Sequence, residues 1–182
     1  MDTVPATGSR PWLVVGNEVG SLLATVDDDE FDRALELLRD PARTWFFTGQ
    51  GRSGLVASMV AMRFMHLGRS VHVQGEVTAP AIQANDGLLV VSGSGVTPVS
   101  LHFAEIAKAE GAVLAVVTHE PHSRIADMAD AVLTLPARRT VQFGGSLFEQ
   151  TALLLLDALV LAIAARTSVP YESMSSRHTN LQ

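Results

Sequence analysis

The sequence predicts an α/β protein in which helices cover both faces of a parallel sheet. Three observations favour this class. Short apolar runs alternate with helical segments, the alternation extends over most of the 182 residues, and no low-complexity linker interrupts it. Parallel strands buried on both faces are continuous apolar runs, and right-handed helical crossovers connect them. With 47% hydrophobic residues the chain can bury one core of ordinary size, so we expect a single domain over residues 1–182.

The first third of the chain predicts a helical N-terminal segment over about residues 12–40, then a strand and a helix. In this segment the acidic residues 27–30 favour a helix start, and apolar residues follow at helical spacing. The run Thr-Trp-Phe-Phe-Thr-Gly at 44–49 predicts a buried strand. The helix predicted over 53–68 ends at Gly68, since glycine is common where a helix stops.

The remaining two thirds continue the alternation up to a polar tail, about residues 167–182. The expected elements are, in order, strands at 70–75 and 87–92, a helix at 98–111, a strand at 112–117, a short helix at 123–130, a strand at 131–136 and a long helix from residue 146. The apolar stretch 151–165 is shorter than the roughly 20 residues of a membrane span and contains Asp157. We expect it to be buried against the sheet or a partner subunit.

Composition argues against several function classes. The chain has no cysteine, so disulfides and thiolate metal sites are impossible, and the composition fits a reducing environment. A formal net charge of −6 argues against nucleic-acid binding, which needs a basic surface. The N-terminus lacks a basic region ahead of an apolar core, so no signal peptide is expected. We therefore expect a cytoplasmic protein that binds neither nucleic acid nor a membrane.

Residues 92–97, Ser-Gly-Ser-Gly-Val-Thr, separate a predicted strand from a predicted helix. Ligands of parallel sheets bind beyond the carboxyl ends of the strands. This segment offers hydroxyl groups, two glycines that let the backbone approach a ligand, and the N-terminus of a helix, which favours an anion. A simple strand-to-helix turn with Thr97 as N-cap explains the same residues.

Residues 49–54, Gly-Gln-Gly-Arg-Ser-Gly, form a second loop of this kind. They match the spacing G-x-G-x-x-G, and Glu76 follows about 20 residues later, so a nicotinamide-dependent dehydrogenase is an alternative. Against it, Arg52 and Ser53 place polar side chains in the loop, and one pyrophosphate does not require a second hydroxyl-rich loop. Two such loops at one end of a sheet fit a small phosphorylated molecule better.

Several segments resemble the sugar isomerase (SIS) domain family, and within it the 6-phospho-3-hexuloisomerases. They are Gly-Arg-Ser-Gly at 51–54, Ser-Gly-Ser-Gly-Val-Thr at 92–97, Ser-Leu-Phe-Glu-Gln at 146–150 and Arg-His-Thr-Asn-Leu at 177–181. The resemblance implies a three-layer αβα sandwich with a flavodoxin-like sheet of five parallel strands, and a homotetramer with shared sites. It also implies the interconversion of D-arabino-hex-3-ulose 6-phosphate and fructose 6-phosphate in the ribulose monophosphate pathway of formaldehyde fixation, without metal or organic cofactor.

The same resemblance assigns the candidate binding residues. The hydroxyl groups that bind phosphate and sugar are those of Ser53, Ser92, Ser94 and Thr97; Gly51, Arg52, Gly93 and Gly95 shape the loops, and Glu76 matches the family's segment after the second strand. Val96 stands where many members have glutamate, which leaves another phosphorylated sugar open as the substrate. A non-catalytic sugar-phosphate sensor is a further alternative, because it would need only the binding residues.

Glu149 and His178 are the catalytic candidates. Moving a carbonyl between C3 and C2 requires a group that takes a proton from one carbon and returns it to the other, and one carboxylate can do both. Ser146 and Glu149 also form the S-x-x-E pattern of a capping box, which is a structural alternative. The resemblance makes Glu149 a catalytic candidate, and the imidazole of His178 can move protons between the substrate oxygens. His119 and His122 lack the spacing of a helical zinc site, so no metal is expected there.

Overall fold

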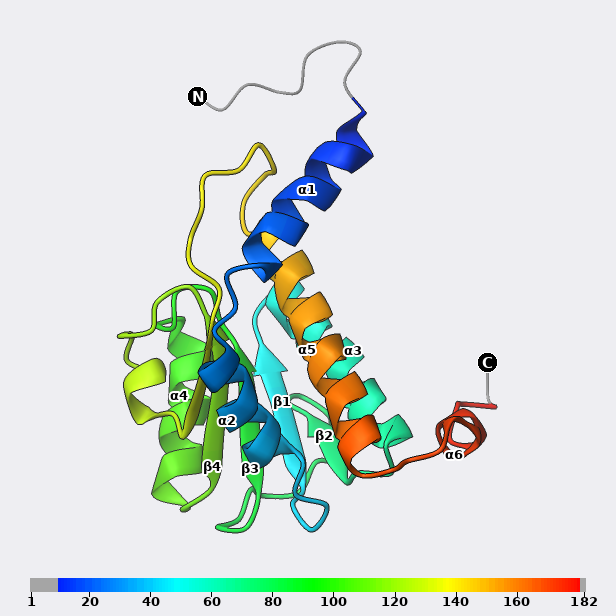
Figure 1. Cartoon of the computed structure of the whole chain (residues 1–182). Coiled ribbons are helices and arrows are strands. Elements are labelled where there is room, and N and C mark those ends of the chain that lie inside the picture. The colour runs from blue at the N-terminus through cyan, green and yellow to red at the C-terminus, as the bar shows by residue number, and fades with distance from the viewer. Residues whose placement is uncertain (1–9, 181–182) are drawn as a thin grey trace.

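A parallel five-stranded sheet lies at the centre of the protein (Figure 1). The computed structural model describes residues 10–180, so Leu181 of the C-terminal motif and the first nine residues lie outside the described part. Within residues 10–180 the strands are β1 (Trp45–Gly49), β2 (Val71–Val73), β3 (Gly87–Val91), β4 (Val113–Thr118) and β5 (Ala131–Thr134). Their order is β2-β1-β3-β4-β5, and neighbouring strands are parallel. This is the flavodoxin-like order, so the predicted fold class is confirmed.

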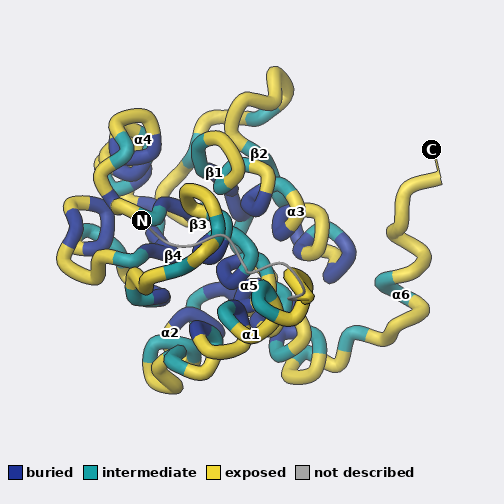
Figure 2. Tube along the Cα trace, turned by 90° about the horizontal axis from the view of Figure 1, so that it is seen from above, coloured by how far each residue is buried: buried dark blue, intermediate teal, exposed yellow. Residues whose placement is uncertain are grey.

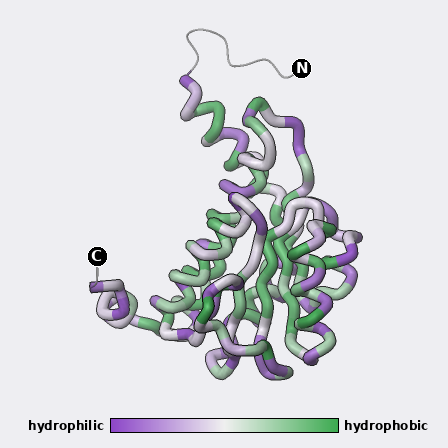
Figure 3. The backbone as a smooth tube through the Cα atoms, turned by 180° about the vertical axis from the view of Figure 1, so that it is seen from behind, coloured by the Kyte–Doolittle hydropathy of each residue, from purple (hydrophilic) through white to green (hydrophobic). Residues whose placement is uncertain are grey.

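Helices cover both faces of the sheet (Figure 2). One face packs against α2 (Asp28–Leu38), α3 (Arg52–His66) and α5 (Ser146–Arg166), and α1 (Pro11–Leu23) packs against α5. The other face packs against α4 (Pro98–Ala109) and the 3-10 helix η1 (Ala126–Met128). Successive strand side chains point to opposite faces, so Phe47 belongs to the first core and Phe46 to the second. The strands are accordingly hydrophobic along most of their length (Figure 3).

The N-terminal helical segment consists of two helices, and the side chain of Asp27 caps the second by accepting a hydrogen bond from the Glu30 N–H at 2.9 Å. Two later segments differ from the sequence expectation. The segment 123–130 contains only η1, because Ala129 already adopts extended backbone ahead of β5. The C-terminal tail contains a short helix, α6 (Tyr171–Ser176).

The long helix α5 is a core helix. Its 21 residues are apolar enough to cross a membrane by length and composition alone, but half of its most apolar stretch is buried inside the protein. Nine of its side chains are buried, Leu156 and Ile163 completely, in the core shared with α3 and the sheet. Burial against the sheet, one of the two locations expected for residues 151–165, is confirmed for the buried half of the helix.

The carboxyl ends of the strands meet at one edge of the sheet, the upper edge in Figure 1. The segments that follow β1, β3, β4 and β5 all begin there. Helix α1 extends beyond this edge, and α6 lies near the opposite one (Figure 1). The upper edge is therefore where the predicted loops 49–54 and 92–97 come together.

Candidate active site

The loop between β1 and α3 brings the end of the strand against the first turn of the helix. A Cβ atom on Gly49 would lie 2.6 Å from the Ser53 carbonyl carbon, and one on Gly54 would lie 2.7 Å from the Gly49 oxygen. Gly51, the N-cap of α3, has a φ of +57°, which favours glycine. These glycines hold Arg52 and Ser53 at the carboxyl edge of the sheet.

The loop between β3 and α4 gathers three hydroxyl groups. The Ser92 and Ser94 Oγ atoms each lie 3.4 Å from Thr97 Oγ1. Thr97 is the N-cap residue of α4, as the alternative interpretation expects, but within residues 10–180 its side chain makes no capping hydrogen bond. Its hydroxyl lies near those of the two serines. The N–H groups of Gly93 and Ser94 likewise have no acceptor in the described chain. The loop therefore offers hydroxyl and N–H donors at a helix N-terminus, as an anion requires.

Neighbouring segments fix the conformation of this loop. The Gly93 oxygen accepts hydrogen bonds from Thr118 Oγ1 at 3.0 Å and from the His119 N–H at 2.9 Å. Gly95 has a φ of +63°, and a Cβ atom there would lie 1.9 Å from Ser123 Oγ. The donors are thus held in place by the segment that follows β4.

Glu149 lies in the first turns of α5 and forms an ion pair with Arg52, through its carboxylate and the Nε of the guanidinium. The glutamate side chain is only 13% exposed. A Cβ atom on Gly145 would lie 3.2 Å from its Oε1, so the glycine leaves room for the carboxylate. The ion pair joins the loop after β1 to the start of α5.

The capping-box interpretation of Ser146 and Glu149 is wrong. The N-cap of α5 is Gly145, which makes Ser146 the first helical residue and Phe148, not Glu149, the third. Ser146 Oγ donates to the Phe143 oxygen at 2.8 Å. Since the carboxylate of Glu149 pairs with Arg52, it is held at the site and not at the helix end.

Glu18 of α1 binds residues 140–142, in the segment that leads to α5. Its carboxylate accepts hydrogen bonds from Thr140 Oγ1 at 2.8 Å, Gln142 Nε2 at 3.0 Å and the Val141 N–H at 3.1 Å. Burial raises the pKa of this carboxyl, but the three hydrogen bonds outweigh that effect and hold the pKa below its ordinary value. The segment that leads to Glu149 is therefore tied to α1.

His178 lies far from these groups within its own chain. Its ring stacks on that of His66 with the centroids 5.4 Å apart, and Arg177 donates to the His66 oxygen at 3.0 Å. His66 ends α3, whereas Ser53 is in the first turn of the same 15-residue helix. At 1.5 Å per residue this places the two ends about 20 Å apart. His178 therefore does not meet Glu149 in one chain.

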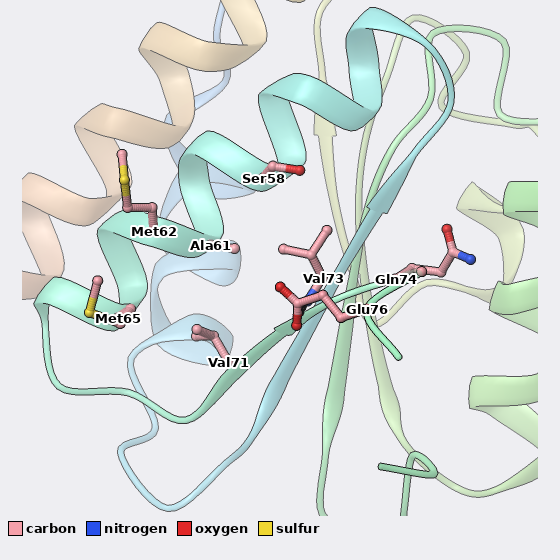
Figure 4. Close-up of a pocket in the computed structure, with 9 residues that line it drawn as sticks. Ser58, Ala61, Met62, Met65, Val71, Val73, Gln74 and Glu76 are labelled. Atoms are coloured by element: carbon pink, nitrogen blue, oxygen red, sulfur yellow. Dashed lines mark hydrogen bonds between the residues drawn. The ribbon is translucent and has the colours of Figure 1, made fainter. Parts of the chain in front are cut away.

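Glu76 lines a pocket that none of the predicted hydroxyl groups lines. It borders a cavity of about 540 Å³ whose lining residues all belong to α3, β2 and the three residues after β2 (Figure 4). Its Oε2 accepts a hydrogen bond from the Val73 N–H at 3.3 Å. The structure thus brings together Gly51, Arg52, Ser53, Glu149 and the loop 92–97, and leaves Glu76 and His178 outside this group.

His119 is not among the predicted site residues, but the structure places it beside the hydroxyl loop. Its ring lies 4.4 Å from that of Phe148, centroid to centroid, and borders Gly93. The sequence pattern could have indicated His119, because it directly follows β4 at the carboxyl edge where the two loops lie. Within residues 10–180, no group of three or more His, Asp or Glu side chains is placed to hold a metal ion.

Comparison with known proteins identifies the family of the chain. The model of the SIS domain family matches residues 38–162. The chain is 41% identical over 177 residues to the 3-hexulose-6-phosphate isomerase of Mycobacterium gastri, which covers 93% of this chain and 88% of the relative. It is 34% identical to the enzyme of that name from Bacillus subtilis, over 91% of this chain and 94% of the relative.

A solved structure from Methanococcus jannaschii, for which a molecular function of 3-hexulose-6-phosphate isomerase has been inferred, has a TM-score of 0.83 at 29% identity. The similarity covers 94% of this chain and 99% of that one. The family match, the sequence identity and the fold agree with one another. The chain therefore belongs to the SIS domain family.

Proposed function

We propose that the protein is a 3-hexulose-6-phosphate isomerase, which interconverts D-arabino-hex-3-ulose 6-phosphate and fructose 6-phosphate. The observation that carries the proposal is the 41% and 34% identity, over more than nine tenths of the chain, to curated enzymes of that name. The site supports it, because hydroxyl donors for a phosphate and a shielded carboxylate lie at the same edge of the sheet.

Under this proposal the loop 92–97 binds the phosphate. Ser92, Ser94 and Thr97 donate their hydroxyl hydrogens to the phosphate oxygens, and the N-terminus of α4 adds its free N–H groups. Ser53 adds a hydroxyl from the first turn of α3. A chain with a net charge of −6 needs such local donors to hold an anion.

Glu149 then transfers the carbon-bound proton. Its carboxylate takes the proton from C2 of the 3-ulose, which leaves an enediolate with the charge on the C3 oxygen, and returns the proton to C3. The proton of the C2 hydroxyl moves to the C3 oxygen as the C2 carbonyl forms, so atoms and electrons balance. Arg52 orients the carboxylate, since the two side chains are already paired.

The proposal includes a cytoplasmic homotetramer. Leu55, Met59 and Met62 recur at helical spacing on α3 and are 66%, 47% and 47% exposed, and Leu154 and Leu161 of α5 are 47% and 73% exposed. A second copy that covers these side chains removes apolar surface from water. Assembly is also the way in which His178 reaches a site, that of another subunit. Light scattering that shows a monomer at micromolar concentration contradicts this part of the proposal.

The test is direct. D-arabino-hex-3-ulose 6-phosphate, supplied by a hexulose-phosphate synthase, is incubated with the purified protein, and fructose 6-phosphate is measured. We expect turnover by the wild type and by Glu110→Gln, which changes an exposed carboxylate at the end of α4, and none by Glu149→Gln.

The same experiment separates the alternatives. Turnover only with another phosphorylated ketose or aldose indicates an isomerase of the same reaction class with a different substrate. Binding of sugar phosphates without turnover, seen as a raised melting temperature, indicates a sensor. A melting temperature raised by NAD and not by sugar phosphates indicates a nicotinamide-dependent dehydrogenase.

A further inference from the structure

His119 lies against Gly93 of the hydroxyl loop and against Phe148, the residue before Glu149. An ideal Cβ atom on Gly93 would lie 3.1 Å from His119 Cδ2, 3.4 Å from His119 Nε2 and 3.6 Å from Phe148 Cδ1. The imidazole therefore occupies the space that the missing side chain of Gly93 leaves, and it packs on the residue that precedes Glu149. Its side chain is partly exposed.

The two ring nitrogens of His119 have different neighbours. Nδ1 lies 2.7 Å from the Leu135 oxygen at the end of β5. A carbonyl oxygen only accepts hydrogen bonds, so Nδ1 carries the proton of this contact. In the neutral ring Nε2 then has a free lone pair, and it is on the side of the ring that borders Gly93.

We infer that His119 is a second catalytic residue, whose Nε2 carries the proton between the two substrate oxygens. This inference rests on the proposed isomerase function. After Glu149 has removed the C2 proton, Nε2 accepts the proton of the C2 hydroxyl and delivers it to the C3 oxygen, while Glu149 returns its proton to C3. The imidazole ends the cycle neutral, and no oxidant or reductant is needed. His119 acts from the same chain as Glu149, whereas His178 requires a second copy.

His119→Asn separates this role from a structural one. The asparagine amide can keep the hydrogen bond to the Leu135 oxygen but has no group at the position of Nε2. We expect kcat for isomerisation to fall about 100-fold or more, as for the loss of a general acid–base group, with the melting temperature within a few degrees of wild type. His122→Asn, which changes an exposed histidine three residues later, is the matched control and should keep wild-type activity.

Hydrogen exchange distinguishes His119 from Glu149. In deuterated water His119→Asn should still exchange the C2 hydrogen of the 3-ulose, because Glu149 still forms the enediolate, whereas Glu149→Gln should not. Isomerisation by His119→Asn within a few-fold of wild type overturns the inference. Absence of turnover in the wild type overturns the proposed function instead.

If His119→Asn does not fold, the wild-type protein provides the measurement. The ¹⁵N shift of His119 Nε2 should change when fructose 6-phosphate is added, while Nδ1 stays protonated. An Nε2 shift that does not change at saturating fructose 6-phosphate also overturns the inference.

Discussion

Replacing Gly95 by alanine tests how the hydroxyl loop is held. Gly95 has a φ of +63°, and the new Cβ would lie 1.9 Å from Ser123 Oγ and 2.4 Å from Ser123 Cβ. The left-handed backbone costs a residue with a Cβ about 1–2 kcal/mol, and overpacking costs about 1–3 kcal/mol. Together the free energy of unfolding should fall by about 2–5 kcal/mol, out of a total of about 5–15 kcal/mol for a typical protein.

The assay is thermal unfolding followed by circular dichroism. For a chain of this length each kcal/mol lowers the melting temperature by about 2–4 °C, so Gly95→Ala should melt about 4–20 °C below wild type. The Michaelis constant for the sugar phosphate should rise as well, because the Gly95 oxygen accepts the Ile125 N–H at 3.1 Å and the displaced loop carries Ser94.

A double-mutant cycle identifies the cause. Ser123→Gly removes both close contacts, so adding it to Gly95→Ala should recover the overpacking part, about 1–3 kcal/mol, and leave the backbone part. Strictly additive costs, or a Gly95→Ala protein that melts within 1 °C of wild type, would falsify this account of the loop.

Three further outcomes are expected. Ser94→Ala removes a hydrogen bond to a charged phosphate, worth about 1.5–3 kcal/mol, so sugar-phosphate binding should weaken roughly tenfold to a hundredfold while the protein still folds. Unchanged kcat and KM would show that Ser94 does not bind the substrate. Arg52→Met removes a partly exposed ion pair, so stability in urea should change by about 1 kcal/mol or less while kcat/KM falls; equal kcat/KM argues against orientation of Glu149. Burial, and after it the charges of His178 and Arg63, lower the pKa of His66. The stability that its neutral ring contributes is therefore present above a pH of about 6.5 and is lost as the pH falls below that value. Urea unfolding at pH 8 and pH 5.5 should show a smaller loss of stability on acidification for His66→Gln than for wild type, and equal losses contradict this.

The sheet and its ligand-binding edge were predictable because their signals are local. Each buried parallel strand is a continuous apolar run, and the loops 49–54 and 92–97 follow two of them directly. The short helix expected at 123–130 was harder, since three residues of 3-10 helix and one turn of α-helix have the same apolar pattern.

The site itself was only partly predictable. Moving the start of α5 by one residue decides whether Glu149 caps the helix or faces Arg52, and helix ends are the least certain part of a pattern. His119 carries no local motif for proton transfer; its position depends on Gly93 and Phe148, which are 26 and 29 residues away in the sequence. Such contacts come from tertiary packing, which a single sequence does not display.

The ion pair between Arg52 and Glu149 has a consequence for how the protein is made. The two residues are 97 positions apart, so the ribosome completes the sheet, which ends at Thr134, before it adds the residue that closes the site. Until α5 follows, Leu89, Val91 and Val117 lack one of the helices that share their core. A nascent chain released before residue 146 therefore leaves uncovered the part of this apolar face between α2 and α3 that α5 covers, and it should aggregate or bind chaperones.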